Sequence, residues 1–269
     1  MARNIMDVLR EGALDSNLRG RTSNMGKAIQ SLVWRDSFIN QAEFSIPLAS
    51  RELRIRQLPN GEINGLGTGL TVWPAACVLL KYLEHHYAPS NGLVGKRVVE
   101  LGCGTGAVGL AAAMLGSHVI LTDQEQILFH IDENVKANHM TADVCAYNWG
   151  EPLSGPLATP VDVVLISDCI LPKLYPVEPL VDAIALLCTR DSVVVLISFE
   201  YRYYEHFDPK SMFWSLIKQR GLIIRGVPIE EHHPKYNADD IEIWEIALTP
   251  SANSDESGHA EDLPHIYSP

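Results

Sequence analysis

The sequence lacks any apolar run long enough to cross a membrane. Its longest apolar stretches, "VDVVLISDCIL" and "SVVVLISF", are far shorter than the ~20 residues that a transmembrane helix needs. The first residues, "MARNIMDVLREGALDS", carry charges where a signal peptide has an uninterrupted apolar segment. We therefore expect no membrane partner and an intracellular protein, cytoplasmic or, as an alternative, nuclear.

Paired cysteines and an excess of positive charge are also missing. None of the five cysteines forms a C-x-x-C pair, which argues against a zinc site or a disulfide framework and favours small buried thiols in a reducing compartment. Lys and Arg total 21 against 33 Asp and Glu, a net charge of −12. Because basic side chains bind phosphate backbones, we expect no nucleic-acid partner. The cysteines are Cys77, Cys103, Cys145, Cys169 and Cys188.

Apolar residues, in contrast, are plentiful: 46% of the 269 residues are hydrophobic, enough for the core of one large domain. Residues 1–35 mix Arg, Ser, Asn and Gly with weak periodicity, which predicts a flexible N-terminal arm. Residues 251–269 are polar and acidic and bury too little apolar surface to fold, which predicts a disordered tail. No linker divides residues 36–250, so we expect one domain and a monomer.

The hydrophobic pattern of residues 36–250 predicts strands that alternate with helices. The segment "EFSIPLASRELRIRQLP", followed by the turn "PNGE", predicts a β-hairpin, and residues 71–87 predict a helix with Pro74 in its first turn. The alternation from residue 97 onward implies a doubly wound, mostly parallel α/β sheet covered on both faces. The last two strands have no helix between them and are expected to be antiparallel neighbours or nearly so. The expected strands are 97–102, 118–123, 144–149, 161–170, 192–202, 222–229 and 241–248, and the helices are 107–116, 124–140, 176–188 and 211–221.

Four glycines fall within eight residues directly after the first of these strands. In a doubly wound sheet, ligands bind outside the carboxyl ends of the strands, where the strand order reverses. Gly102, Gly104 and Gly106 end the strand and open a helix, so a ligand can approach the bare backbone and the free N–H groups. Asp123 ends the second strand and is placed to accept hydrogen bonds from both hydroxyls of a ribose. The alternative is a tight turn capped by an aspartate.

Two classes of ligand fit this loop. Residues 104–109 satisfy the G-x-G-x-x-G pattern of NAD(P)-dependent oxidoreductases. Glu100, two residues before Gly102, argues against a dinucleotide, because a carboxylate repels a pyrophosphate but suits a ligand with an ammonium and a sulfonium group. The last two strands also argue against a dinucleotide, because they have no helix between them, whereas a dinucleotide-binding fold repeats its βαβ half.

This E-x-G-x-G-x-G motif and the antiparallel last strand resemble the seven-strand, Rossmann-like S-adenosylmethionine-dependent methyltransferases. Within that class, four segments resemble the family-16 methyltransferases, the group of methyltransferase-like-21 protein-lysine methyltransferases. The segments are "GLTVWPAACVLLKYLEHH", "VVELGCGTGAVGLAAAMLGSHVILTD", "YNWGEPL" and "VLISDCIL". The resemblance covers roughly residues 40 to 248.

The resemblance implies a set of cofactor-binding residues. It places Trp73 against S-adenosylmethionine, packs Trp149 on the adenine and assigns the ribose to Asp123. On general grounds the alternative for Trp73 is a core or hinge tryptophan. Ser167 stands where the family has a small Ala facing the cofactor. The expected backbone cradle is Gly102, Cys103 and Gly104, with Glu100 beneath it.

The resemblance also implies a substrate side, with Asp168 as the catalytic residue; a helix-capping aspartate before Pro172 is the alternative. The family motif is D-x-x-Y or D-x-x-F, whereas Leu171 stands here at the aromatic position, and Tyr175 is our candidate to replace it. An acid-x-Arg element near the substrate entrance is represented by Glu200 and Arg202, with a surface ion pair as the alternative. We expect no metal, and we expect His232 and His233 to face solvent.

The sequence thus predicts an S-adenosylmethionine-dependent methyltransferase acting on a lysine of a protein. Alternatives that keep the cofactor are transfer to a histidine or another protein nitrogen, or to a small molecule, and the Leu171 departure favours them. Alternatives of another class are an NAD(P)-dependent oxidoreductase and a cofactor-binding module without catalysis.

Overall fold

The structure is a computed structural model that describes residues 34, 41–58 and 68–249. The predicted turn "PNGE", the predicted tail and the whole of the predicted arm except Trp34 lie outside the described residues. Trp34 itself is buried, and the centre of its ring lies 5.8 Å from that of Tyr236.

The predicted β-hairpin is confirmed. Strands β1 (Glu43–Leu48) and β2 (Arg51–Arg56) are antiparallel, and Ala49 and Ser50 connect them with φ angles of 45° and 66°. Positive φ at both turn residues is the geometry that matches the twist of the two strands. Alternate side chains of β1 are buried, so one face of the hairpin packs on the domain and the other meets solvent.

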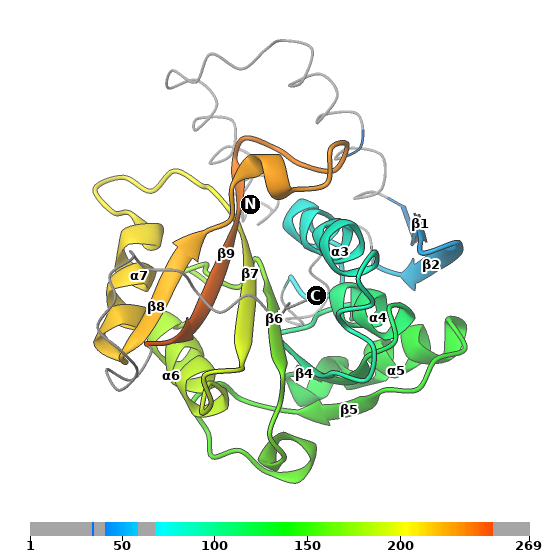
Figure 1. The fold of residues 1–269 in the computed structure, drawn as a ribbon, viewed down its shortest axis with the longest axis horizontal. Helices are drawn as coiled ribbons and strands as arrows, with labels where there is room; N and C mark the ends of the chain where they lie inside the picture. Colours follow the sequence, from blue (N-terminus) through cyan, green and yellow to red (C-terminus); the bar gives the residue numbers. More distant parts are fainter. Residues whose placement is uncertain (1–33, 35–40, 59–67, 250–269) are drawn as a thin grey trace, which may run out of the picture.

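The seven-stranded sheet has the order β5-β4-β3-β6-β7-β9-β8 (Figure 1). Strands β3 to β7 are parallel to their neighbours, whereas β9 is inserted antiparallel between β7 and β8, as predicted for the closing pair. The third predicted strand ends three residues early, so Trp149 lies in the loop beyond it. The strands are β3 (Arg97–Leu101), β4 (His118–Asp123), β5 (Asp143–Ala146), β6 (Val163–Ser167), β7 (Val194–Glu200), β8 (Leu222–Gly226) and β9 (Ile241–Leu248).

Helices cover both faces of this sheet, and two apolar clusters fill the space between the layers (Figure 1). The first cluster joins α3 (Pro74–Tyr87), α4 (Ala107–Met114), α5 (Leu128–Ala137) and the hairpin to one face. The second joins α6 (Val177–Leu187) and α7 (Pro209–Gln219) to the other face. Short 3-10 turns are η1 (Glu125–Ile127), η2 (Gly155–Ala158) and η3 (Ile229–Glu231).

Local sequence explains where these helices begin. Pro74 and Pro209 occupy first-turn positions, where a backbone N–H would have no partner within the helix, so its absence in proline costs no hydrogen bond. Asp208 caps α7, because its side chain accepts hydrogen bonds from the backbone N–H groups of Lys210 and Ser211. The helix predicted over 124–140 begins instead with η1, and α5 follows from Leu128.

One surface prediction is wrong. His232 is only 3% exposed and packs beside the ring of Tyr82, while His233 is partly buried. The loop that carries both histidines folds back on α3, which the sequence pattern did not reveal. In the described part of the chain, no helix combines the length and the apolarity that crossing a bilayer requires.

Candidate active site

A cavity of about 460 Å³ lies at the carboxyl ends of β3, β4 and β6. This is the edge where the strand order reverses, since β4 lies on one side of β3 and β6 on the other. The volume falls in the ~300–1,000 Å³ range of small-molecule and cofactor sites. Every predicted cofactor-binding residue lines it: Trp73, Glu100, Gly102, Cys103, Gly104, Asp123, Trp149 and Ser167.

The glycine loop after β3 is shaped by contacts with other parts of the chain. Gly102 and Gly104 have φ angles of 62° and 55°, in the left-handed region that glycine adopts without strain. A Cβ on Gly102 would lie 2.9 Å from the ring of Trp149, and a Cβ on Gly104 would lie 2.6 Å from the carbonyl oxygen of Gly69. Because Gly102 and Gly104 have no side chains, Trp149 and the segment before α3 can pack directly against the backbone of the loop.

The last glycine of the motif serves the packing of α4 on the sheet. A Cβ on Gly109 would lie 2.3 Å from a methyl group of Leu121 and 2.7 Å from Oε2 of Glu100. The backbone N–H of Gly109 donates a hydrogen bond of 2.7 Å to that same carboxylate oxygen. The G-x-G-x-x-G match thus has a structural reason that does not require a dinucleotide.

Glu100 is a buried carboxyl in the wall of the cavity, with only 1% of its surface exposed. Burial raises its pKa to about 8, and the nearby carboxylate of Asp123 adds to this effect, whereas the hydrogen bond from Gly109 opposes it. The carboxyl is therefore poised to ionise when a positively charged group enters the cavity.

Asp123 is held by two backbone hydrogen bonds at the end of β4. Its Oδ2 accepts from the N–H of Gly104 at 2.7 Å, and its Oδ1 accepts from the N–H of Gln124 at 2.7 Å. Burial raises its pKa, although both hydrogen bonds counteract the rise. Each oxygen keeps a further acceptor position, which suits a pair of hydroxyl groups.

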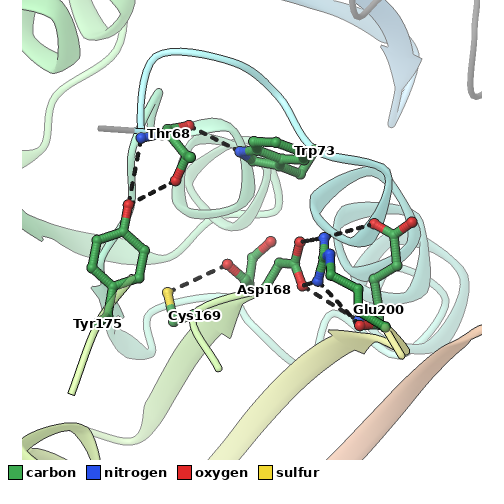
Figure 2. Close-up of polar contacts among 8 residues, drawn as sticks. Thr68, Trp73, Asp168, Cys169, Tyr175 and Glu200 are labelled. Carbon is green, nitrogen blue, oxygen red and sulfur yellow. Dashed lines mark hydrogen bonds and ion pairs between the residues drawn. The ribbon is translucent and has the colours of Figure 1, made fainter. Parts of the chain in front are cut away.

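Four aromatic residues line the cavity: Trp73, Tyr147, Trp149 and Tyr175. Thr68 connects two of them, Trp73 and Tyr175 (Figure 2). The indole N–H of Trp73 donates to the carbonyl oxygen of Thr68 at 2.9 Å, and the hydroxyl groups of Thr68 and Tyr175 are 2.7 Å apart. Tyr175 also meets Trp149 edge to face, with 6.2 Å between the ring centres. The segment before α3 is thereby tied to the loop after β6.

Asp168 follows β6 and lines the cavity, and its carboxylate is paired with Arg202 (Figure 2). Nη1 of Arg202 donates to Oδ1 of Asp168 at 2.7 Å, and Nη2 donates to Oδ2 as well as to Oε2 of Glu200 at 3.1 Å. Burial alone would lower the pKa of Arg202, but the two carboxylates hold it above its usual value. Asp168 has a φ of 55°, an uncommon conformation for a non-glycine residue that is concentrated at functional sites.

Two substrate-side alternatives are decided by burial. Glu200 and Arg202 are 7% and 4% exposed, so the surface ion pair is wrong, and neither residue is among those that line the cavity. Leu171 is 3% exposed and also lies outside the cavity lining, whereas Tyr175 belongs to it. The Asp168 side chain is bound to Arg202 in place of capping a helix, and α6 begins only at Val177.

The sequence analysis missed several residues of the lining. Gln124 and Ile127 follow Asp123, and Tyr147 and Asn148 precede Trp149. The "TG" pair Thr68 and Gly69, just ahead of the predicted helix, was the one local signal of a second loop at the cavity. The other contacts depend on how distant segments meet, which no local pattern encodes.

The residues present fit S-adenosylmethionine. The buried carboxyl group of Glu100 and the partly buried carboxyl group of Asp123 face a cavity that also has aromatic walls. Ser167 lines the cavity, and its hydroxyl oxygen is buried and makes no hydrogen bond within the described part of the chain.

Comparison with known proteins identifies the family. A family model described as lysine methyltransferase matches residues 49–220. Protein N-lysine methyltransferase METTL21A of Danio rerio is 35% identical over 173 residues, which cover 62% of this chain and 75% of that protein. EEF1A lysine methyltransferase 3 of Xenopus tropicalis is 33% identical over 170 residues, which cover 62% of this chain and 71% of that protein.

A solved structure shares the fold. The 16S rRNA N2 G1207 methyltransferase RsmC of T. thermophilus, in complex with AdoMet and guanosine, has a TM-score of 0.56 and 19% identity. The similarity covers 77% of this chain and 50% of that chain. The family match runs from the hairpin to α7 and so includes the whole cavity wall from Thr68 onward. The chain therefore belongs to the lysine methyltransferase family, which confirms the predicted S-adenosylmethionine-dependent methyltransferase and sets the dinucleotide alternative aside.

Proposed function

We propose that this chain transfers a methyl group from S-adenosylmethionine to the side-chain nitrogen of a lysine in a protein substrate. The observation that carries the proposal is a juxtaposition within one cavity. Glu100 and Asp123 lie at the glycine loop, and Asp168, a buried carboxylate paired with Arg202, lies at the end of the neighbouring strand. The relatives named as lysine methyltransferases support the same acceptor.

The cofactor side of the cavity provides complementary groups for each part of the ligand. Bound S-adenosylmethionine supplies an activated methyl group on a positively charged sulfur. We assign the ribose hydroxyls to Asp123, the adenine to the face of Trp149 and the positive charge to Glu100. Ser167, Trp73 and the backbone of Gly102, Cys103 and Gly104 complete this half of the site.

Asp168 is the residue we assign to the lysine nitrogen. Asp168, Glu200 and Arg202 form a buried cluster in which one guanidinium pairs with two carboxylates. A lysine side chain arriving beside Asp168 would meet a carboxylate that is already fixed in direction, which favours an acceptor that carries or develops positive charge. Asp168 would orient the nitrogen and stabilise the positive charge that develops on it during transfer.

The free lysine amine is the reactive form, although lysine is protonated in water with a pKa near ~10.4. Burial of the side chain and the nearby sulfonium charge both lower that pKa, whereas the carboxylate of Asp168 raises it, so the first two effects have to prevail for the proton to leave. Because Arg202 occupies two acceptor positions of Asp168, we assign Asp168 the role of orienting group, and the proton leaves to solvent before transfer.

The remaining substrate-side residues receive different roles. We propose that Tyr175 replaces the family aromatic that is missing at Leu171, because Tyr175 lines the cavity and Leu171 does not. Glu200 and Arg202 act through Asp168: they fix the direction of its carboxylate from behind the cavity wall.

We further propose a cytoplasmic or nuclear monomer that acts on protein and not on nucleic acid. The five cysteines support a reducing compartment, since all are free thiols in the structure. The net charge of −12 supports attraction of a basic protein segment and repulsion of a phosphate backbone.

The test is methylation of a cell lysate with S-adenosylmethionine that carries a labelled methyl group, followed by mass spectrometry of the modified residue. Asp168→Asn serves as the matched variant, since it keeps the size of the side chain and removes its charge. We expect labelled lysine with the wild-type chain and a rate lower by about 10²–10³-fold with the variant, the effect of losing one group that stabilises charge in the transition state. Label found on histidine or on a small molecule, and not on lysine, would contradict the proposed acceptor. Cofactor binding without any label would indicate a module without catalysis.

A further inference from the structure

Asn134 on α5 and Asn138, which caps the C-terminal end of α5, bind the backbone at the edge of the β-hairpin as a neighbouring strand would. The side-chain amide of Asn138 accepts from the N–H of Arg54 at 3.0 Å and donates to its carbonyl oxygen at 2.6 Å. One helical turn earlier, Asn134 accepts from the N–H of Arg56 at 2.8 Å and donates to its carbonyl oxygen at 3.1 Å. Two alternate residues of β2 thus have their backbone groups satisfied by helix side chains.

Asn134 makes one contact that Asn138 does not. Its Nδ2 also donates to the carbonyl oxygen of Thr105 at 2.9 Å, and Thr105 belongs to the glycine loop and lines the cavity. The other contacts of Asn138 stay within α5, where its Nδ2 donates to the carbonyl oxygen of Asn134 at 2.8 Å. Asn134 is fully buried, so the competing solvent bonds are excluded.

Other anchors of the glycine loop come from β4 and from the segment after β6. The N–H of Cys103 donates to the carbonyl oxygen of Thr122 at 2.9 Å, and the N–H of Gly104 donates to Asp123 at 2.7 Å. The thiol of Cys169 donates to the carbonyl oxygen of Gly102 at 3.7 Å. Asn134 adds an anchor from a different element and links the loop directly to the hairpin.

We infer that Asn134 is a positioning residue for the cofactor, which ties the glycine loop to the hairpin and holds the loop in its binding shape. A loop with glycines at positions 102, 104 and 106 has many alternative conformations, and selecting one before binding raises affinity. The inference rests on the proposed binding of S-adenosylmethionine at this loop.

The test compares Asn134→Asp with Asn138→Asp. Each replaces an amide NH₂ that faces two carbonyl oxygens by a carboxylate oxygen that cannot donate, and each disturbs the same hairpin edge. Only Asn134→Asp also releases Thr105. We measure the Kd of the demethylated cofactor by calorimetry and the hydrogen exchange of the loop amides in the ligand-free protein.

We expect Asn134→Asp to raise the Kd about tenfold and to accelerate exchange at Gly104 and Gly106, and Asn138→Asp to change the Kd by less than about twofold. Where an aspartate variant does not fold, Asn134→Ala and Asn138→Ala provide the same comparison. Equal Kd changes in the two positions, or unchanged loop exchange in the Asn134 variant, would overturn the inference. A wild-type chain that binds no cofactor contradicts the proposed function instead, and the exchange data then still decide the role of Asn134.

Discussion

Arg202 donates two hydrogen bonds to the carboxylate of Asp168, and both side chains are buried. The arginine lies two residues beyond β7, and the aspartate lies one residue beyond β6. Because these strands are parallel neighbours, their carboxyl ends meet at the cavity, and Ser167 is paired with Ser198 in the register. The pair thus fixes the one carboxylate that we assign to the lysine nitrogen.

Replacing Arg202 tests how much of the fold depends on this pair. Arg202→Met would remove the cation that both hydrogen bonds of the Asp168 carboxylate depend on, and we expect the free energy of unfolding to fall by about 3–5 kcal/mol. Arg220 offers a matched control, since it forms an ion pair with Asp182 in which both side chains are at least one third exposed. Arg220→Met should lower the free energy of unfolding by about 1 kcal/mol or less. Urea denaturation measures both, and similar losses would contradict the importance of the buried pair.

The main features of the fold followed from patterns that are local in the sequence. The glycine loop, Asp123 and the order of strands and helices are encoded within short segments, and β3, β4 and α4 formed where the pattern placed them. The closing antiparallel pair followed from the absence of a helix between two strands. The early end of β5, which leaves Trp149 in a loop, was not encoded in this way, because apolar residues continue beyond the last ladder bond.

The sequence named the predicted cofactor-binding residues that line the cavity, but not the contacts between them. A surface ion pair stayed open as the alternative for Glu200 and Arg202, because nothing near them in the sequence reveals that Asp168 lies beside them. His232 was misplaced for the same reason, since the loop that buries it packs on a distant helix. The family resemblance identified Leu171 as a departure from the aromatic residue of the family motif. Only the path of the loop from Asp168 to Tyr175 shows that Tyr175 lies in the cavity.

The hydroxyl contact between Thr68 and Tyr175 provides a further prediction about cofactor binding. Tyr175→Phe and Thr68→Val each remove one hydroxyl and keep the shape of the side chain, so each breaks the same 2.7 Å contact. We expect each variant to raise the Kd of the demethylated cofactor by about 3–10-fold, the equivalent of one hydrogen bond. The fluorescence of Trp73 and Trp149, which both line the cavity, reports binding.

The double variant decides whether these two residues act through each other. If the contact is what matters, Tyr175→Phe combined with Thr68→Val should be no worse than either change alone. Additive effects would mean that each hydroxyl acts independently and that no bridge across the cavity contributes to binding.

His232 predicts a loss of stability in mild acid. Burial lowers its pKa from the usual 6.5, and this effect outweighs the backbone of Val227 and the nearby carboxylates of Glu231, Glu230 and Glu242, which raise it. The unfolded chain therefore binds a proton more readily than the folded chain, and stability falls as the pH drops below 6.5. Thermal melting at pH values from about 5 to 8 should show a steeper acid loss for wild type than for His232→Gln. Parallel curves would refute this role.

Glu100 predicts the opposite dependence on pH. Its pKa is raised from 4.5 to about 8 by burial, so the folded chain holds this proton more tightly than the unfolded chain. The stabilisation is complete below pH 4.5 and is lost as the pH rises through 8. Relative to Glu100→Gln, the wild-type chain should lose free energy of unfolding across that interval, which urea titrations at several pH values measure.

The same shift makes cofactor binding release a proton. At neutral pH the carboxyl of Glu100 is largely protonated in the ligand-free chain, and a positive charge beside it favours the ionised form. Calorimetry of S-adenosylmethionine binding in buffers of different ionisation enthalpy should therefore show proton release by the wild-type chain. Glu100→Gln should bind with less release, because its amide carries no acidic proton. Equal release by both chains would place the ligand's positive charge away from Glu100 and withdraw that assignment.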